Sequence, residues 1–378
     1  MKKLFTTHEY KLRNQVKNKK RAKRQKRSKL KTGDGSSLSH YAYSNEDRVE
    51  NYRRAYSLEE RYSDYVFVWA PKLMSFIRNT TYVLTFINNI RYHFKKGRKV
   101  FVRLDSVEEI DHDAIVLLLS IMVQFKSSKI DFNGSFPRDG YCRGLLRESG
   151  FLTYLYKSKF EAEDNYNLSN RLVHTSANKD VDAVLSERLI TEASKTVWGE
   201  KRRCQGVQRA LIELMHNTNN HADPVQERQE HFWISVNHRK SENKVSFAFL
   251  DFGVGVFTSL GNKPSGNKFY NWESLLRSVH TFDSNARLLQ LILDGSLHET
   301  VTGKFYRGKG LPGIKDVLSR NQISNLYIIT NDVRACVSED KYELLGENFK
   351  GTFVYWELSL LNASFAYYDE NIENFEGV

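Results

Sequence analysis

The chain has 378 residues, of which 40% are hydrophobic and 27% charged, and its net charge is +12. This length allows two or three domains, and the apolar fraction supports a buried core, so the composition excludes a wholly disordered chain. The longest apolar run, Ala114–Val123, is too short to cross a bilayer, and no apolar stretch follows the first lysines, so we expect neither a membrane segment nor a signal peptide. The three cysteines, Cys142, Cys204 and Cys336, are too far apart in the sequence for a disulfide framework or a four-cysteine zinc site. We therefore expect a cytoplasmic protein with reduced thiols and no membrane partner.

The positive charge is concentrated at the N-terminus. Residues 1–32 contain fourteen lysine and arginine residues and one acidic residue, Glu9, whereas the rest of the chain is close to neutral. The densest part, Lys17–Lys31, lacks aromatic residues, so it predicts contact with nucleic-acid phosphates rather than stacking on bases. A solvated tail without a partner is the alternative. We predict a basic, disordered tail over 1–40, followed by a polar stretch, 41–63, that no pattern assigns.

From residue 64 the sequence becomes typical of a folded domain. Strands are predicted where β-branched and aromatic residues cluster, and helices where an apolar pattern is bounded by a capping residue. In chain order these elements are a strand at Val100–Leu104, a helix at Ala114–Phe125 capped by Asp111 or Asp113, a strand at Lys129–Phe132 and a helix at Tyr141–Gly150. The alternation of strands and helices predicts a small α/β unit.

This stretch resembles a STAS domain, the fold of bacterial anti-sigma-factor antagonists, through the segments VFVRLDSVEEIDHDAIVLLL, DFNGSFP and LLRESGF. The resemblance covers residues 64–158 and implies an adaptor for a protein partner. In that family a serine that is switched by phosphorylation follows the aspartate at the start of the helix. Here His112 and Asp113 stand at those positions, so no hydroxyl group is available there and we do not expect a phosphorylation switch.

Residues 159–182 are polar and are predicted to be a linker. A second domain is predicted at 183–362, followed by a C-terminal tail at 363–378. Three motifs of this second domain contain candidate catalytic and ligand-binding residues.

The first motif is an amphipathic helix at Arg209–Ala222, RALIELMHNTNNHA. Its apolar stripe consists of Val207, Ala210, Leu211, Leu214 and Met215. Glu213 and Asn217 lie one turn apart beside this stripe, where they would line a pocket rather than enter the core. A carboxylate can activate a water molecule, and an asparagine carbonyl suits Mg²⁺. Taken alone, this spacing is very common and is more typical of a solvated helix face.

The second motif, VSFAFLDFGVG, ends a predicted pair of strands at Phe232–Val236 and Val245–Leu250. Asp251 closes the second strand and could accept a hydrogen bond from an amine. Gly253 and Gly255 follow and would let the backbone approach a ligand closely. A protein kinase also contains D-F-G, but neither its catalytic-loop motif nor its glycine loop precedes this segment.

The third motif, YRGKGLPGIKD, places three glycines before a short helical pattern. Backbone N–H groups at such a helix start favour phosphate. The spacing also matches the dinucleotide fingerprint, which requires a following βαβ unit that we do not find.

In this order the three motifs resemble the GHKL ATPase superfamily, which includes gyrase B, MutL, ninety-kilodalton heat-shock chaperones and histidine kinases. The resemblance covers 183–362 and implies an α/β fold of the Bergerat type, a sandwich with a mixed sheet and helices on one face, which binds ATP and Mg²⁺. It implies that Glu213 is the general base that activates water and that Asn217 coordinates Mg²⁺. Asp251 would bind the adenine amine, with Gly253 and Gly255 shaping the adenine pocket.

The resemblance assigns the remaining ligand contacts to two later segments. Gly308, Gly310 and Leu311 would form the glycine box at the triphosphate, and Arg307 and Lys309 are candidates for phosphate contact. Thr352, which follows Gly351 and precedes a predicted strand at Phe353–Leu358, would support adenine through a water molecule.

About fifty residues separate the second and third motifs and include a helical stretch at Ser274–Gly295. In this family that region is the ATP lid, and its length here suggests an insertion that binds a partner. A lid that becomes ordered on nucleotide binding would act as a switch.

The sequence lacks features that particular classes of GHKL protein require, and this limits the activities that we expect. The histidine that would be phosphorylated in a histidine kinase is not found, because His174 is not followed by an acid, and little chain follows Thr352 to supply a transducer domain. We predict a Mg-ATP-binding and ATP-hydrolysing switch, whose partner is a protein at the STAS-like domain or lid, or a nucleic acid at the basic tail. The alternatives are an anti-sigma-type serine/threonine kinase, in which Glu213 activates a substrate hydroxyl, and a non-hydrolysing nucleotide-sensing scaffold. The layout suggests a bacterial or phage context and leaves dimerisation open.

Overall fold

The computed structural model describes residues 58–149, 151, 171–176, 181–220, 231–261, 285–295 and 310–362. The chain divides into two compact units, Met1–Ser63 and Asp64–Val378. The described part of the first unit contains the short helix α3 (Leu58–Arg61). The predicted tails, 1–40 and 363–378, lie outside the described residues.

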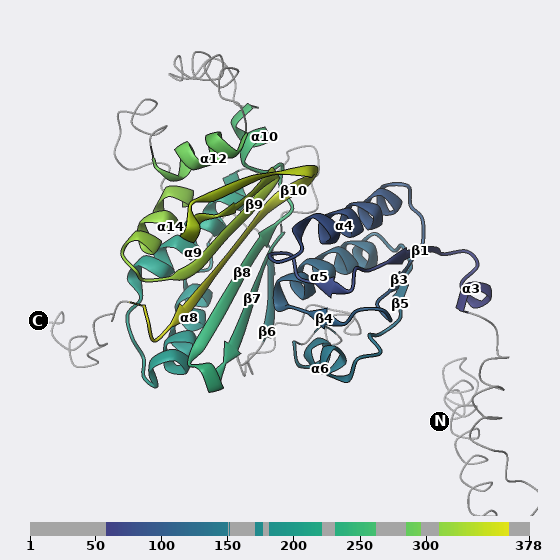
Figure 1. The fold of residues 1–378 in the computed structure, drawn as a ribbon, viewed down its shortest axis with the longest axis horizontal. Coiled ribbons are helices and arrows are strands. Elements are labelled where there is room, and N and C mark those ends of the chain that lie inside the picture. The colour runs from purple at the N-terminus through teal and green to yellow at the C-terminus, as the bar shows by residue number, and fades with distance from the viewer. Residues whose placement is uncertain are drawn as a thin grey trace, which may run out of the picture. The chain divides into compact units, whose positions relative to one another are not determined.

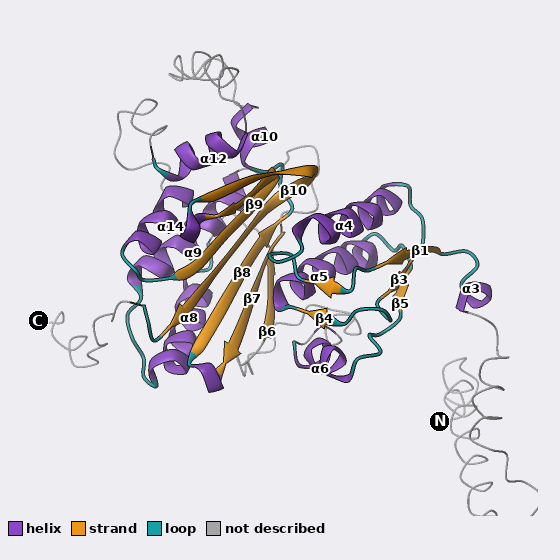
Figure 2. Cartoon of the chain, viewed as in Figure 1, coloured by secondary structure: helices purple, strands orange, loops and turns teal. Residues whose placement is uncertain are grey.

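The second unit begins with a small parallel sheet (Figures 1 and 2). Its strands are β1 (Val66–Trp69), β3 (Val100–Arg103) and β5 (Phe132–Gly134), in the order β1-β3-β5. The segments between them contain α4 (Thr80–Lys95), α5 (His112–Ser127) and a parallel pair formed by β2 (Leu73–Met74) and β4 (Glu109–Ile110), and α6 (Gly140–Glu148) follows β5. Asp139 caps α6 by accepting a hydrogen bond from the N–H of Cys142, 2.8 Å away.

A five-stranded antiparallel sheet forms the centre of the second unit. In spatial order its strands are β6 (Arg171–Ser176), β7 (His231–Arg239), β8 (Lys244–Asp251), β10 (Lys341–Ser359) and β9 (Ser324–Cys336). The 3₁₀ turns Lys240–Glu242 and Val337–Glu339 connect β7 to β8 and β9 to β10. The helices of this part are α8 (Ala183–Trp198), α9 (Gln205–Asn220), α10 (Val256–Gly261), α12 (Asn285–Leu293) and α14 (Gly310–Ser319).

The five-stranded sheet is apolar on both faces. Along β8, Phe247 and Phe249 point to the core under α8, α9, α12 and α14, whereas Ala248 and Leu250 point to the core shared with α4 and α5. Antiparallel sheets commonly leave one face in water, and this one does not. As Figure 1 shows, α4 and α5 therefore form the second helical layer of this sheet.

Phe76, which immediately precedes α4, joins the two parts of this core. It is fully buried, and its ring lies 5.2 Å from the ring of Phe349 and 5.1 Å from that of Phe353 in edge-to-face contacts. The sequence predicted domains at 64–158 and 183–362, and that boundary stays a prediction. Residues of both ranges share one core within a single compact unit.

The general α/β class is confirmed, but details of the predicted sandwich differ. The described strands of the larger sheet are antiparallel throughout, not mixed, and helices cover both of its faces. Residues 171–176, inside the predicted linker, form strand β6 at the edge of this sheet. An edge strand pairs through its backbone, so it requires little of the apolar pattern that reveals a buried strand.

Most of the predicted elements that fall on described residues are present, with shifted ends. The strand predicted at Lys129–Phe132 begins only at Phe132, because Lys129 adopts a positive φ of 57° and closes the end of α5. Asp111 is the N-cap of α5, although its side chain makes no capping hydrogen bond. Of the helix predicted at Ser274–Gly295, the described part contains α12. None of the described helices has the length and apolar character that crossing a membrane requires.

Replacing Phe76 by alanine should destabilise the whole of Asp64–Val378. The cavity and the lost apolar contacts should lower the free energy of unfolding by about 3–5 kcal/mol. Urea denaturation followed by tryptophan fluorescence and by circular dichroism should show one shared transition, because both layers depend on this core. The control is Tyr82→Ala on α4, whose side chain is 69% exposed and whose loss should cost less than about 0.5 kcal/mol. Separate transitions for the two layers would contradict the shared core.

Candidate functional site

Asp251 is a buried carboxylate at the end of a central strand. The alternation along β8 puts its side chain on the same face as Phe247 and Phe249, the face covered by α9 and α14. Burial raises the pKa of Asp251 to about 6, against the opposing effect of backbone hydrogen bonds from Gly253 and Thr352. The Gly253 N–H donates to Oδ1 over 2.7 Å. No side-chain donor among the described residues pairs with this carboxylate, so within the described part of the chain its acceptor capacity is not fully used.

Two glycines allow the backbone to close around Asp251. Gly351 has a φ of +140°, and a Cβ there would collide with the carbonyl oxygen of Asp251. Thr352 lies directly opposite Asp251 in the pairing of β10 with β8. Gly255 has a φ of +80°, and a Cβ there would lie 2.6 Å from Nδ2 of Asn331. At both positions a side chain would push the turn away from its neighbour.

The turn after Asp251 is held by two polar residues of β9, Thr330 and Asn331, both buried. Oγ1 of Thr330 accepts from the N–H of Val256 over 3.0 Å and donates to the carbonyl of Gly351, also over 3.0 Å. Asn331 accepts from the N–H of Phe257 over 3.1 Å and donates to the carbonyl of Val254 over 3.1 Å. This pair therefore joins the glycine turn to the segment that carries Thr352.

Thr330 and Asn331 were not found from the sequence. The signal that could have revealed them is the polar triplet Thr330-Asn331-Asp332, which interrupts an otherwise apolar strand. Asn331 also has a φ of +49°, a conformation that asparagine tolerates better than most residues, at an irregular point in the pairing of β9 with β10.

Glu213 and Asn217 lie on α9 as the amphipathic pattern predicted. The apolar stripe of α9 is buried in the core, while Glu213 and Asn217 are half-buried beside it. Neither side chain makes a hydrogen bond or ion pair with another described residue. Among the described residues, therefore, none competes for either group.

Helix α14 packs along α9. A Cβ at Gly206, in the first turn of α9, would lie 3.3 Å from Cγ2 of Val317, near the end of α14. The two helices therefore run antiparallel, and α14 begins, with Gly310 and Leu311, toward the half of α9 that carries Glu213 and Asn217. Leu311 itself is buried in the core. The other glycine-box candidates, Arg307, Gly308 and Lys309, lie outside the described residues.

The structure thus brings Asp251, Gly253, Gly255 and Thr352 together at one end of the sheet, and α9 covers the same face. Within the described ranges, histidine, cysteine and carboxylate side chains do not gather in groups of three or more that could hold a metal ion. A Mg²⁺ ion held by one asparagine, water and substrate phosphates needs no such group. All three cysteines are buried and unpaired.

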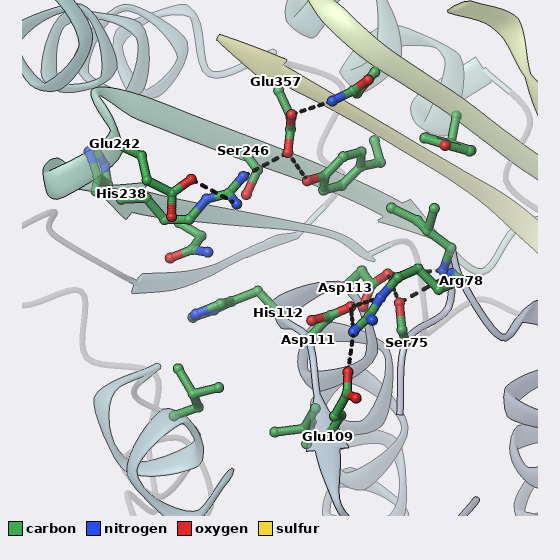
Figure 3. Close-up of a pocket in the computed structure, with 18 of the residues that line it drawn as sticks. Ser75, Arg78, Glu109, Asp111, His112, Asp113, His238, Glu242, Ser246 and Glu357 are labelled. Carbon is green, nitrogen blue, oxygen red and sulfur yellow. Dashed lines mark hydrogen bonds and ion pairs between the residues drawn. The ribbon is translucent and has the colours of Figure 1, made fainter. Parts of the chain in front are cut away.

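A polar cavity of about 760 Å³ lies near the opposite end of β8, between the sheet and the start of α5 (Figure 3). Its two arginines are neutralised: Arg78 pairs with Glu109 and Asp111, both at 3.0 Å, and Arg239 pairs with Glu357 at 2.7 Å. Burial lowers the pKa of each lining histidine, His112 and His238, to about 4, so both are neutral at pH 7. The lining also includes Glu108 and Glu242, so acidic side chains outnumber the two arginines in this cavity.

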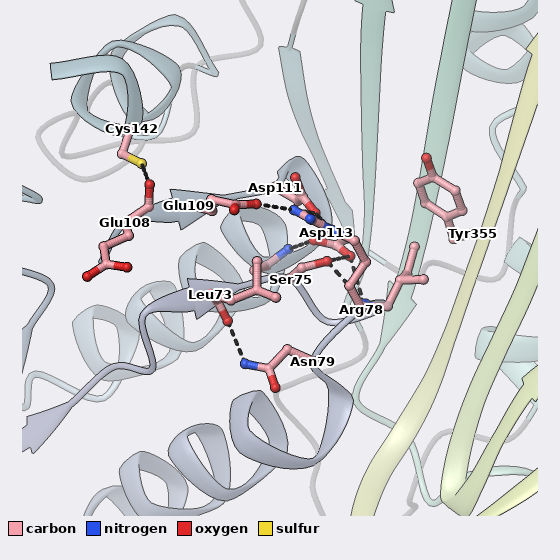
Figure 4. Close-up of polar contacts among 12 residues, drawn as sticks. Leu73, Ser75, Arg78, Asn79, Glu108, Glu109, Asp111, Asp113, Cys142 and Tyr355 are labelled. Carbon is pink, nitrogen blue, oxygen red and sulfur yellow. Dashed lines mark hydrogen bonds and ion pairs between the residues drawn. The ribbon is translucent and has the colours of Figure 1, made fainter. Parts of the chain in front are cut away.

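Asp113, which occupies a position where the STAS resemblance would place a serine, ties the start of α5 to the segment before α4 (Figure 4). Its oxygens accept from the N–H of Ile77 over 3.0 Å and from its neighbour Ala114 over 2.6 Å. The Ser75 hydroxyl lies 3.4 Å away and is fully buried. Burial raises the pKa of Asp113 to about 7, and the nearby charge of Asp111 adds to the effect. This environment is that of a structural carboxyl group.

Searches of protein-family models, of curated proteins and of solved structures found no match to this chain.

Asp113 should make the fold less stable as the pH rises from 5 to 8. Its pKa is 3.8 when unperturbed and about 7 in the fold, so between these values the native state holds the extra proton and loses it as the pH rises. The free energy of unfolding should fall by on the order of 3 kcal/mol across this range through Asp113. Urea titrations at each pH should show a shallower decline for Asp113→Asn, whatever its absolute stability. Parallel curves for the two proteins would refute the raised pKa.

Proposed function

We propose that this protein binds Mg-ATP and hydrolyses it. The observation that carries the proposal is the buried, incompletely hydrogen-bonded carboxylate of Asp251, enclosed by Gly253, Gly255 and Thr352. An acceptor in that state suits an exocyclic amine, which adenine has and guanine lacks at the equivalent ring position. Gly255 and Gly351 let the backbone pack closely against Asn331 and the Asp251 carbonyl, which fixes the turn around this carboxylate.

The catalytic roles fall to α9 in this proposal. Glu213 would orient and deprotonate the attacking water, and Asn217 would supply one ligand to Mg²⁺, with the phosphates and water as its other ligands. When bound, Mg²⁺ would neutralise charge on the phosphates. The half-buried, unpaired state of both side chains supports these roles, since neither is already committed to another described residue. The start of α14, at Gly310, would offer backbone N–H groups to the phosphates.

The order of the motifs supports a GHKL-type ATPase. A helix with Glu213 and Asn217, a strand that ends in Asp251, a glycine turn and a second glycine-led helix follow each other along the chain and pack on one face of one sheet. We further propose that the region between α10 and α14 acts as the lid, and that the STAS-like layer or the lid receives a protein partner. A nucleic-acid partner at Lys17–Lys31 remains a separate prediction.

One labelling experiment separates hydrolysis from the two alternatives. The protein is incubated with ATP labelled in the γ-phosphate, alone and with candidate partner proteins. Label in free phosphate supports an ATPase. Label transferred to a protein serine or threonine means a kinase, in which Glu213 activates a hydroxyl group instead of water. ATP binding without either product means a nucleotide-sensing scaffold.

Asp251→Asn should abolish ATP binding, because an asparagine presents one acceptor and one donor group where adenine and the backbone require acceptors. Calorimetry should show no saturable binding for the variant.

For the wild type, adenosine is the probe of pH dependence, since it has no phosphate that titrates. With a free-state pKa of about 6, the ionised form falls between pH 7 and pH 5, so affinity should drop about tenfold by ligand-observed NMR. Unchanged ATP affinity in the variant would refute the adenine assignment.

Glu213→Gln should leave ATP binding nearly intact and slow phosphate release by about a hundredfold or more, because the amide cannot accept the proton of water. The matched control is His216→Ala, an exposed position on the same helix, which should keep the wild-type rate. Phosphate release at the wild-type rate in Glu213→Gln would place the general base elsewhere.

A further inference from the structure

Helix α4 belongs to the α/β elements of residues 64–149, which we call the N-terminal layer. It contacts the part of β10 that leads into Gly351 and Thr352. Asn88 donates to Oε2 of Glu347 over 2.7 Å and to the carbonyl of Asn348 over 3.2 Å. The Thr85 hydroxyl donates to Oε1 of Glu347 over 2.6 Å. With the contact of Arg91 to Lys350, side chains of α4 thus reach three residues of β10: Glu347, Asn348 and Lys350.

Arg91 contacts both backbone segments that enclose Asp251, from the opposite face of the sheet. Its Nη1 donates to the carbonyl of Lys350 over 3.1 Å, immediately before Gly351. Its guanidinium carbon lies 4.7 Å from the centre of the Phe252 ring, immediately after Asp251. Phe252 in turn packs toward Phe349, at 6.1 Å between ring centres. One side chain therefore connects the two segments across the end of the sheet.

Arg91 occupies this position at an energetic cost. Its side chain is half-buried, no acidic side chain among the described residues pairs with it, and desolvation lowers its pKa to about 10. The pKa of nearby Lys95 is lowered first by the charge of Lys350, then by burial, and also by the charge of Arg91. Burying an unpaired cation near other cations is unfavourable, so the contacts with Phe252 and the Lys350 carbonyl must offset that cost.

We propose that Arg91 is a positioning residue of the proposed nucleotide site, and that through it α4 sets the affinity of the Asp251 site for ATP. It holds Phe252 and Lys350 in place, and these neighbours fix the backbone of Asp251 and of Gly351–Thr352. The inference rests on the proposed function for the identity of the ligand. The contacts of Arg91 with Phe252 and Lys350 are a property of the fold and do not depend on that function. Linkage makes the effect reciprocal: a nucleotide bound at Asp251 stabilises α4 through the same side chain.

The test compares Arg91→Met and Arg91→Lys with a matched control, Arg334→Met. Arg334 also bridges the two layers: it donates to the carbonyl of Ile77 over 3.2 Å and lies over the Tyr327 ring at 5.4 Å, but it does not contact the Asp251 turn. Hydrogen exchange of the ligand-free proteins is measured in peptides that cover 251–255 and 350–352. Calorimetry measures ATP affinity, and exchange of α4 is measured with and without ATP.

Arg91→Met should raise exchange in both peptides and weaken ATP binding, each by about tenfold, and ATP should no longer protect α4. Arg91→Lys keeps the charge and one donor and should retain most of the affinity. Arg334→Met should leave the two peptides and the ATP affinity within about twofold of wild type while it lowers thermal stability. Wild-type exchange in Arg91→Met, or equal effects of the two methionine variants, would overturn the proposal. If the wild type binds no ATP, the proposed function fails, and the exchange of the two peptides still decides the role of Arg91.

Discussion

The structure depends on a five-stranded sheet that is apolar on both faces. On one face the rings of Phe247 and Trp356 stack 5.2 Å apart under the helices, and on the other Phe353 packs against Phe76. Burial of each such ring is worth about 1.5–3 kcal/mol, so neither face can be left in water. The N-terminal α/β layer therefore completes the core of the sheet, in addition to any role as an adaptor.

This constraint also explains the state of Asp251. The alternation that buries Phe247 and Phe249 continues for one more step, so the next side chain on that face is a carboxylate in a position built for an apolar group. Its desolvation is opposed by backbone N–H groups, yet only in part, as its raised pKa shows. Because the sheet is buried on both faces, the carboxylate at the end of β8 is desolvated, and a ligand could satisfy the acceptor capacity that the backbone leaves unused.

The sequence predicted well what depends on neighbouring residues. The stripe of α9, the placement of Glu213 and Asn217 beside it, and the pairing of β7 with β8 follow from local periodicity. Contacts between distant segments were not predictable in this way. Asn331 is 77 residues from the carbonyl of Val254 that it binds, and Arg91 is 259 residues from Lys350. Asn331 and Arg91 are polar residues, and the apolar pattern of a strand or helix does not reveal what its polar side chains contact. Strand β6 was missed for another reason: an edge strand requires little of the apolar pattern that reveals a buried strand.

The shape of the Asp251 site is therefore set largely by residues that would not touch a ligand. Thr330 and Asn331 hold the turn from within the sheet, and Arg91 holds it from the α4 side. Gly255 and Gly351 approach Asn331 and the Asp251 carbonyl too closely for any side chain to fit between them. A displacement of this turn must consequently move either the irregular part of β9 or the end of α4. Since packed elements move as units rather than deform continuously, the turn and the N-terminal layer are mechanically one assembly.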